Sequence, residues 1–340
     1  VYSLPLVYGN GIKGGGANTS AYSGSFFKNH LNNGITSPYI YDNRNCSPTD
    51  AVLIWQDEKD LVTGVRLSQD KKRLEFKVDR LTIRQGNAIV AVRKQGVIMW
   101  SWHIWVTDYK LGDGIKTMYS RGGRGYEMMP VNIGWCDGET KTYEKRQVLV
   151  RFTQTGTGKT VVVPLVQTEY KITQKGNNPY FQFGRKDPML GSFVIGSSSP
   201  TAKTCYGYQF AVRGGLVAIA TGITNPHVFY HDNSSNPNGR NWTSEKSSGL
   251  WGWAFSSITP IDRSVNKTIY DPSPCGYCLP ASGVFSATTL DGNEQGQDRK
   301  INADKFISDF LSNGGGYFYC KRMKGLGKWD ESDGTIFFPA

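Results

Sequence analysis

Three tryptophans fall within six residues, inside a β-favouring run from residue 99 to 109. Alternate side chains of a strand face opposite ways, so this run divides into two faces. They are Trp100, Trp102, Ile104 and Val106 on one side and Met99, Ser101, His103 and Trp105 on the other. The first face is apolar enough to be core. The second sets an indole beside an imidazole, which suits a half-buried sheet face or a binding platform. We favour core packing.

Further strands are expected on both sides of this run. Apolar or alternating segments lie at 51–55, at 74–78, in two strands within 88–105 around a turn at 94–96, at 147–153 and at 160–167. Pro164 predicts that the last of these is an edge strand or carries a bulge. One helix is expected between Asn302 and Gly314, where apolar residues recur at i, i+3, i+4, i+7 and i+8.

The character of the chain changes near residues 170–177, where β-rich sequence gives way to mixed, loop-heavy sequence. With 340 residues and 40 glycines, the chain has room for one large or two ordinary domains. We therefore predict a mainly β protein with a β-sandwich region, immunoglobulin-like or fimbrillin-like, over 1–174 and an α+β domain over 175–340. The opening at Val1, without Met or a signal peptide, suggests a mature product or a fragment.

Charge and hydropathy narrow the classes of partner. Lysine and arginine number 39 and aspartate and glutamate 28, a net charge of +11. The cations are scattered through unrelated segments, which indicates a solvated surface more than an anion-binding patch. A single Arg-Gly-Gly-Arg segment at 121–124 is weak evidence for nucleic acid, so we expect no nucleic-acid partner. No apolar run is long enough to span a membrane.

Six cysteines, an even number, permit three disulfides in an exported chain but leave 15 possible pairings. Cys275 and Cys278 have the spacing of a redox or half-zinc motif. There is no second such pair, and three nearby prolines predict a rigid loop instead of the helix N-terminus that lowers a thiol pKa. We expect neither a metal site nor a redox dithiol here.

Catalytic patterns are weak throughout the sequence. The segment 155–160 resembles the end of a phosphate-binding loop, but Thr153 occupies the position of the first glycine and a strand follows where a helix is required. There is no Gly-x-Ser-x-Gly elbow, and no pattern groups the carboxylates. His227 and His231 lie four residues apart in a Pro/Asn-rich loop that would not aim both rings at a metal. We therefore expect a protein that is not an enzyme.

The loops after residue 225 combine carboxylate, amide and indole groups, as carbohydrate sites do. Aromatic faces stack on sugar CH groups, while Asp, Asn and Arg bond to hydroxyls, and loops on a rigid scaffold often carry binding. The alternative is that these aromatic side chains fill the interior of their own domain. The candidate ligand-binding residues are Tyr230, Asp232, Asn241, Trp242, Trp251 and Trp253.

Several long segments resemble one group of proteins. The stretch 86–93 leading into 98–108 resembles the GNAV-A…WSWHIWVTD element of Bacteroidales fimbrillin-like surface proteins. The segment 178–188 resembles their YYQWGRKDP element. The segments 242–246 and 267–272 resemble the WTSEK and TIYDP elements of the Fibrobacter succinogenes major paralogous domain, and 316–322 and 335–340 are similar to it as well. The match follows the order of the family over nearly the whole chain.

This resemblance implies a C-type-lectin-like fold for 175–340 and an exported protein of the bacterial cell surface, passed through the outer membrane and associated with pili. The family's cysteine in its YDPCP element is Ser273 here, so a family disulfide would have to be re-paired with Cys275 or Cys278. Relatives continue beyond the FFPA element, so we expect the lectin-like domain to be truncated at its C-terminus.

We therefore expect a surface or fimbrial-tip adhesin that recognises glycans or host surfaces non-covalently, with other fimbrial subunits as partners. The alternative is a structural pilus or surface-assembly subunit with protein partners alone, joined by strand addition. No cofactor is expected, and nothing in the sequence supports calcium.

Overall fold

The computed structural model describes residues 1–119, 123–137, 139–174, 178–190, 204–232, 241–245, 247–252 and 265–281, and the backbone of 288–289, 315–320, 322–324, 328–330 and 335–339. Strand makes up 38% of the chain and helix 7%, which confirms the prediction of a mainly β protein. The helix expected between Asn302 and Gly314 lies outside the described residues.

The strands, in chain order, are β1 Tyr2–Pro5, β2 Ile12–Lys13, β3 Gly16–Ala17, β4 Asp50–Gln56, β5 Thr63–Leu67, β6 Arg73–Lys77, β7 Gly86–Lys94, β8 Val97–Val106, β9 Lys116–Tyr119, β10 Gly125–Met128, β11 Glu139–Tyr143, β12 Arg146–Thr153, β13 Thr160–Gln167, β14 Tyr170–Gln174, β15 Tyr180–Phe181, β16 Pro188–Met189, β17 Tyr206–Gly207, β18 Ala211–Gly214, β19 Val228–His231, β20 Thr288–Thr289, β21 Gly315–Cys320, β22 Arg322–Lys324, β23 Lys328–Asp330 and β24 Thr335–Pro339. The helical segments are η1 Thr19–Ala21, η2 Ile40–Asp42, α1 Ile219–Thr224 and η3 Ser247–Trp251.

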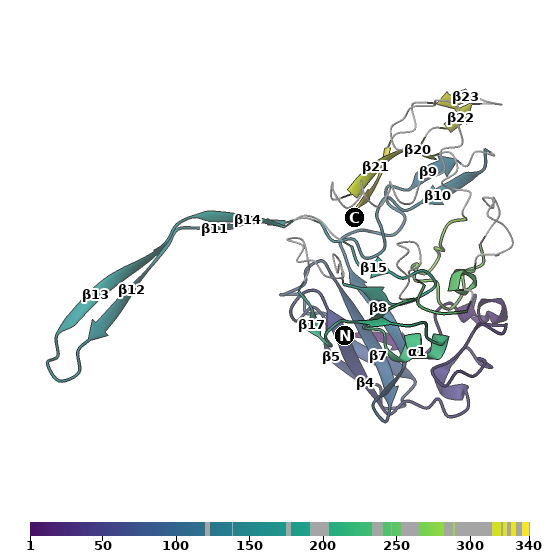
Figure 1. Ribbon diagram of the computed structural model, residues 1–340, viewed down its shortest axis with the longest axis horizontal. Coiled ribbons are helices and arrows are strands. Elements are labelled where there is room, and N and C mark those ends of the chain that lie inside the picture. Colours follow the sequence, from purple (N-terminus) through teal and green to yellow (C-terminus); the bar gives the residue numbers. More distant parts are fainter. Residues whose placement is uncertain are drawn as a thin grey trace.

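A four-stranded antiparallel sheet, in the order β17-β4-β7-β8, carries the tryptophan run (Figure 1). The predicted hairpin between β7 and β8 is confirmed, with Gln95 and Gly96 at φ of 51° and 81°. Two consecutive positive φ angles match the right-handed twist of the strands, and glycine takes one of them without a Cβ penalty. Local turn chemistry therefore fixes this register.

The two faces of β8 follow the predicted alternation with one exception. Trp100 is buried in the main hydrophobic cluster, with Trp102, Ile104 and Val106 packed against that cluster. Met99, predicted to lie on the opposite face, belongs to the same cluster as Trp100. A bulge between Val92 and Arg93 inserts an extra residue into the pairing at this point, and such a bulge changes which way the neighbouring side chains point.

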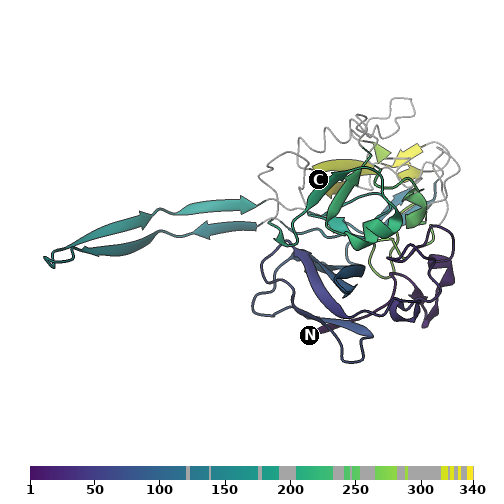
Figure 2. The same ribbon diagram turned by 60° about the horizontal axis from the view of Figure 1, so that its bottom comes forward.

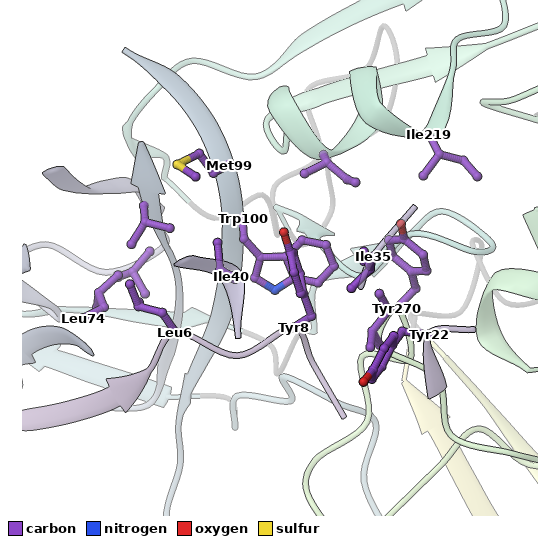
Figure 3. Close-up of a cluster of buried hydrophobic side chains, with 14 of the residues drawn as sticks. Leu6, Tyr8, Tyr22, Ile35, Ile40, Leu74, Met99, Trp100, Ile219 and Tyr270 are labelled. Carbon is purple, nitrogen blue, oxygen red and sulfur yellow. The ribbon is translucent and has the colours of Figure 1, made fainter. Parts of the chain in front are cut away.

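The main hydrophobic cluster draws on both of the predicted ranges, 1–174 and 175–340. Leu74 comes from the second sheet, in the order β1-β6-β5, and Trp100 from β8. Ile219 of α1 and Tyr270 belong to the same cluster (Figure 3). The rings of Tyr8 and Trp100 pack in a T-shaped pair, with a centroid distance of 4.8 Å and an interplanar angle of 88°. The division near residue 174 stays a prediction, as does the sandwich and lectin-like arrangement.

At the end of the first of these ranges, over residues 139–174, the chain leaves the core in a long two-stranded ribbon. The β12–β13 hairpin is confirmed as predicted, and β11 pairs with β14 in the same register. Cross-strand partners add up to 313 at every pair from Glu139↔Gln174 to Thr153↔Thr160, so the two hairpin segments form one continuous ribbon. In Figure 1 and in the rotated view of Figure 2 the ribbon projects away from the rest of the molecule.

Candidate functional site

Two indoles predicted to bind sugar are buried and hydrogen-bonded inside the protein. Trp242 is 3% exposed and donates from Nε1 to the carbonyl of Phe183 at 2.9 Å. Trp251 is 6% exposed and donates from Nε1 to the carbonyl of Arg185 at 3.1 Å. A stacking platform needs an accessible ring face, and neither ring has one. Both fill the interior, the alternative considered for these loops.

The other predicted residues that the structure describes are not all exposed, so they do not form a common open surface. Tyr230 lies buried in β19, where its carbonyl accepts a hydrogen bond from Gln182, and burial raises the pKa of its phenol. Asp232 is half-buried just after β19, Asn241 is exposed, and Trp253 lies outside the described residues. Polar loop composition suggested exposure for these aromatic residues, but burial of a loop depends on what packs over it.

Arg185, which the sequence prediction missed as a site residue, organises this region from within. Its buried guanidinium donates to the carbonyls of Val228 at 2.5 Å, Asn225 at 2.9 Å and Gly222 at 3.1 Å, and lies 5.6 Å from the Trp242 ring centroid. These carbonyls end α1 and belong to β19, so one side chain satisfies several acceptors. Burial lowers the pKa of Arg185 to about 10, so the side chain stays charged at neutral pH.

The next two residues form a buried ion pair against the tryptophan strand. Lys186 Nζ lies 2.7 Å from both carboxylate oxygens of Asp187 and donates to the hydroxyl and carbonyl of Ser101 in β8. It also lies 4.5 Å from the Trp100 ring centroid. Burial lowers the pKa of Lys186, and the carboxylate of Asp187 opposes that shift. The polar face of β8 is therefore covered at Ser101 by Lys186 and Asp187, and it does not offer an open binding surface there.

His103 and Cys136 do not have the geometry of a catalytic pair. The Asn87 amide lies between them and donates to Cys136 Sγ at 3.4 Å, while its Oδ1 lies 2.9 Å from His103 Nε2. A general base has to reach the nucleophile's proton directly or through one water. Burial also lowers the pKa of His103 to about 3, so the ring is neutral and supplies a donor to Asn87. This network ties β7, β8 and residues 134–136 together.

The Cys275–Cys278 loop is held by a carboxylate. Asp271 accepts from the amides of Ser273 at 2.8 Å and Leu279 at 3.0 Å, and lies 3.3 Å from Lys267 Nζ. Both cysteines are exposed thiols, and Cys46, Cys136 and Cys205 are also thiols. The Cys278 residue is exposed but its thiol is partly desolvated, and this desolvation together with the nearby Asp271 raises the pKa of Cys278, which disfavours a reactive thiolate.

Within the part of the chain that the structure describes, no three His, Cys, Asp or Glu side chains are grouped so that they could hold a metal ion. Among the same residues, no helix has the length and apolar character needed to cross a bilayer.

Among the residues that the structure describes, the projecting ribbon carries many of the exposed large apolar side chains, and more of them lie on one of its faces than on the other. Cross-strand partners share a face, so the even-numbered residues of β12 and the odd-numbered residues of β13 lie together. We call their six central side chains the apolar face of the ribbon: Val148, Val150, Phe152, Val161, Val163 and Leu165. Val163 is 39% exposed and Val148 60% exposed, and an isolated two-stranded ribbon is only marginally stable in water. Such a face is typical of a surface that another molecule covers.

The two edges of the ribbon differ. Gln154 N donates to the Lys159 carbonyl, so these two residues form a hydrogen-bonded pair. Such pairs alternate along an antiparallel ladder with pairs whose backbone groups point outward, and the pair of Leu149 and Pro164 is one of the outward-pointing pairs. Pro164 lacks an amide, so the outer edge of β13 is interrupted at its centre. This agrees with the prediction of an edge strand. The outer edge of β12 has no proline, and it is the edge better suited to strand addition.

Comparison of the chain with protein-family models, with curated proteins and with solved structures gave no match. The candidate site therefore rests on its geometry.

Proposed function

We propose that this chain is a structural subunit of a bacterial surface assembly that binds protein partners through the projecting ribbon. The observation that carries the proposal is the apolar face of the ribbon, where five side chains are exposed and Val150 is half-buried. The resemblance of the sequence to fimbrillin-like surface proteins supports an exported, cell-surface location. Of the two functions expected from the sequence, the burial of Trp242 and Trp251 favours the structural one over glycan recognition.

Truncation of the ribbon tests the proposal. Residues 145–168 would be replaced by Asn-Gly, which joins Glu144 to Glu169 through a two-residue turn of the kind that antiparallel strands favour. In the native producing cells, we expect the truncated chain to be exported and folded but absent from high-mass surface complexes. Full incorporation of the truncated chain would contradict the proposal.

Glycan recognition is tested by the same pair of proteins. A structural subunit gives no signal on a glycan array with either chain. A strong glycan signal that survives truncation would favour the adhesin function over the structural one. It would also locate the glycan-binding site outside the ribbon.

A further inference from the structure

The loop that holds Cys275 and Cys278 turns back on itself, and one buried carboxylate joins its two ends. Asp271 accepts a hydrogen bond from the amide of Ser273 on one oxygen and from the amide of Leu279 on the other, at 2.8 and 3.0 Å. Asp271 is itself buried. The chain therefore reverses direction between residues 273 and 279, and both cysteines lie within that reversal.

A glycine-containing turn sets the spacing of the two cysteines. Tyr277 N donates to the carbonyl of Pro274 at 3.0 Å, and Gly276 has a φ of 87°. A hydrogen bond from the fourth residue to the first, with a positive φ at the third, is the pattern of a type II turn, which favours glycine at that position. Cys275 is second in this turn and Cys278 follows it directly. An extended chain would separate residues three apart by about 10 Å, beyond the reach of about 7 Å that a disulfide spans, and the turn shortens this separation.

Both thiols are accessible and share a charged neighbour. Cys275 and Cys278 are exposed. Burial lowers the pKa of Lys267, and Asp271 and both thiols oppose that shift through their negative charge when ionised. The two sulfurs therefore lie in the neighbourhood of one ammonium group. The other cysteines whose side chains the structure describes are buried or half-buried: Cys46, Cys136 and Cys205.

We propose that Cys275 and Cys278 form a disulfide with each other when the chain meets a disulfide-bearing oxidant. The thiolate of one cysteine attacks the oxidant and releases one of its sulfurs as a thiol, and the second cysteine then displaces the other sulfur. In total the two cysteines give up two protons and two electrons, and the oxidant's disulfide is reduced to two thiols. The thiols in the structure are the reduced form of this site. The exported location of the proposed function would supply such an oxidant.

This bond is structural and not catalytic. A catalytic dithiol depends on a thiol with a lowered pKa, as at a helix N-terminus, whereas desolvation and the nearby Asp271 raise the pKa of Cys278. Less thiolate is then present at neutral pH, so closure should be slow near pH 7 and faster toward about pH 9. The site therefore agrees with the expectation that this pair is not a redox dithiol.

Peptide mapping of the purified full chain tests the pairing. Trypsin cleavage after Lys267 and Arg299 releases a peptide, 268–299, that contains these two cysteines and no other. After incubation with glutathione disulfide and then alkylation, we expect this peptide to carry no alkyl group and to be lighter by two hydrogens than its reduced form. After dithiothreitol it should carry two alkyl groups. Two alkyl groups after oxidation, or a link to another cysteine peptide, would overturn the pairing.

Single cysteine variants provide the matched control. Cys278→Ser should trap Cys275 as a mixed disulfide with glutathione, because no second thiol is present to displace the glutathione sulfur. Cys205→Ser removes a half-buried thiol elsewhere in the chain and should leave the disulfide within 268–299 unchanged. Loss of that disulfide in Cys205→Ser would show that Cys205 takes part in the pairing.

A synthetic peptide of residues 268–299 tests whether the fold favours the bond. The equilibrium constant for closure against the glutathione couple should be at least about tenfold larger in the folded chain than in the peptide, because the folded loop is already turned. A constant no larger than that of the peptide would show that the loop does not bring the two thiols together.

Alkylation of intact native cells before lysis separates this inference from the proposed function. We expect the 268–299 peptide from these cells to contain the disulfide. If the purified chain closes the bond but the chain in cells keeps both thiols, the pairing stands and the exported location is contradicted. If the purified chain does not close it, the pairing fails, and the proposed function, which rests on the ribbon, is unaffected.

Discussion

Lys186 and Asp187 show how single residues join the two halves of this sequence. The pair is buried against Ser101 of β8, which lies more than 80 residues earlier in the chain. A buried ion pair contributes little net stability, but loss of one partner leaves an uncompensated charge. The pair therefore holds residues 185–187 in one position against β8.

We predict that Asp187→Ala lowers the free energy of unfolding by about 3–5 kcal/mol, because it leaves the Lys186 ammonium buried without a counter-charge. The double variant Lys186→Met with Asp187→Leu should recover most of this loss, since it removes both charges at similar volume. Urea denaturation followed by tryptophan fluorescence measures both. Equal destabilisation by the single and the double variant would show that the charge is not the cause.

Protonation of His103 provides a second residue-scale prediction. Burial lowers its folded pKa to about 3, so between pH 6.5 and 3 the unfolded chain binds a proton that the folded chain does not. The free energy of unfolding should therefore fall as pH falls through this window, by up to about 1.4 kcal/mol per pH unit from this group. His30, whose pKa burial lowers to about 4, adds a fall of the same sign.

Thermal unfolding of the wild type and of His103→Gln over pH 4–7 separates the two histidines. The variant keeps a donor that can reach Asn87 and lacks the titrating ring, so its loss of stability with acid should be shallower. A variant with the same slope as the wild type would show that His103 does not carry this dependence.

At the scale of elements, the β7–β8 and β12–β13 hairpins were predictable because their information is local. Apolar alternation defines each strand, and glycine-containing turns fix each register. The bulge at Val92/Arg93 was not predictable, because nothing in the local alternation marks the extra residue, and it moved Met99 to the other face.

Burial of the loop indoles could not be read from the sequence for a different reason. The acceptors of Trp242 and Trp251 are the carbonyls of Phe183 and Arg185, about 60 residues away, and backbone acceptors leave no trace in residue type. One available clue was Arg185 itself. An arginine in a compact aromatic segment, followed directly by Lys and Asp, suggests buried charges with internal partners.

The ribbon should be independent of the core. Its apolar face projects away from the main hydrophobic cluster, and none of the six side chains belongs to that cluster. We predict that replacement of 145–168 by Asn-Gly changes the midpoint of thermal unfolding at low protein concentration by no more than a few degrees, about 1 kcal/mol or less. Calorimetry of the two chains measures this. A much larger loss would mean that the ribbon supports the folded body.

At the scale of the whole molecule, the core and the ribbon differ in where they place their apolar side chains. The body buries its aromatic residues around Trp100, whereas the ribbon exposes valines and a phenylalanine along one face. The net charge of +11 is scattered over the sequence, and at the base of the ribbon Glu144 and Glu169 stand beside Arg146 and Lys171. The described part of the molecule thus combines a core that buries its aromatic residues with a ribbon that exposes apolar ones.

The most direct test replaces Phe152 by photoreactive benzoyl-phenylalanine and irradiates intact producing cells. The ring already lies 58% exposed at the end of the apolar face, so the substitution keeps its size class and its position. We predict a discrete protein adduct heavier than the 37.7 kDa chain, cross-linked through position 152 to a partner subunit. The same group at Arg151, on the opposite face, should give little adduct. If position 152 yields no protein adduct, or no more than position 151, the apolar face of the ribbon is not a protein contact surface.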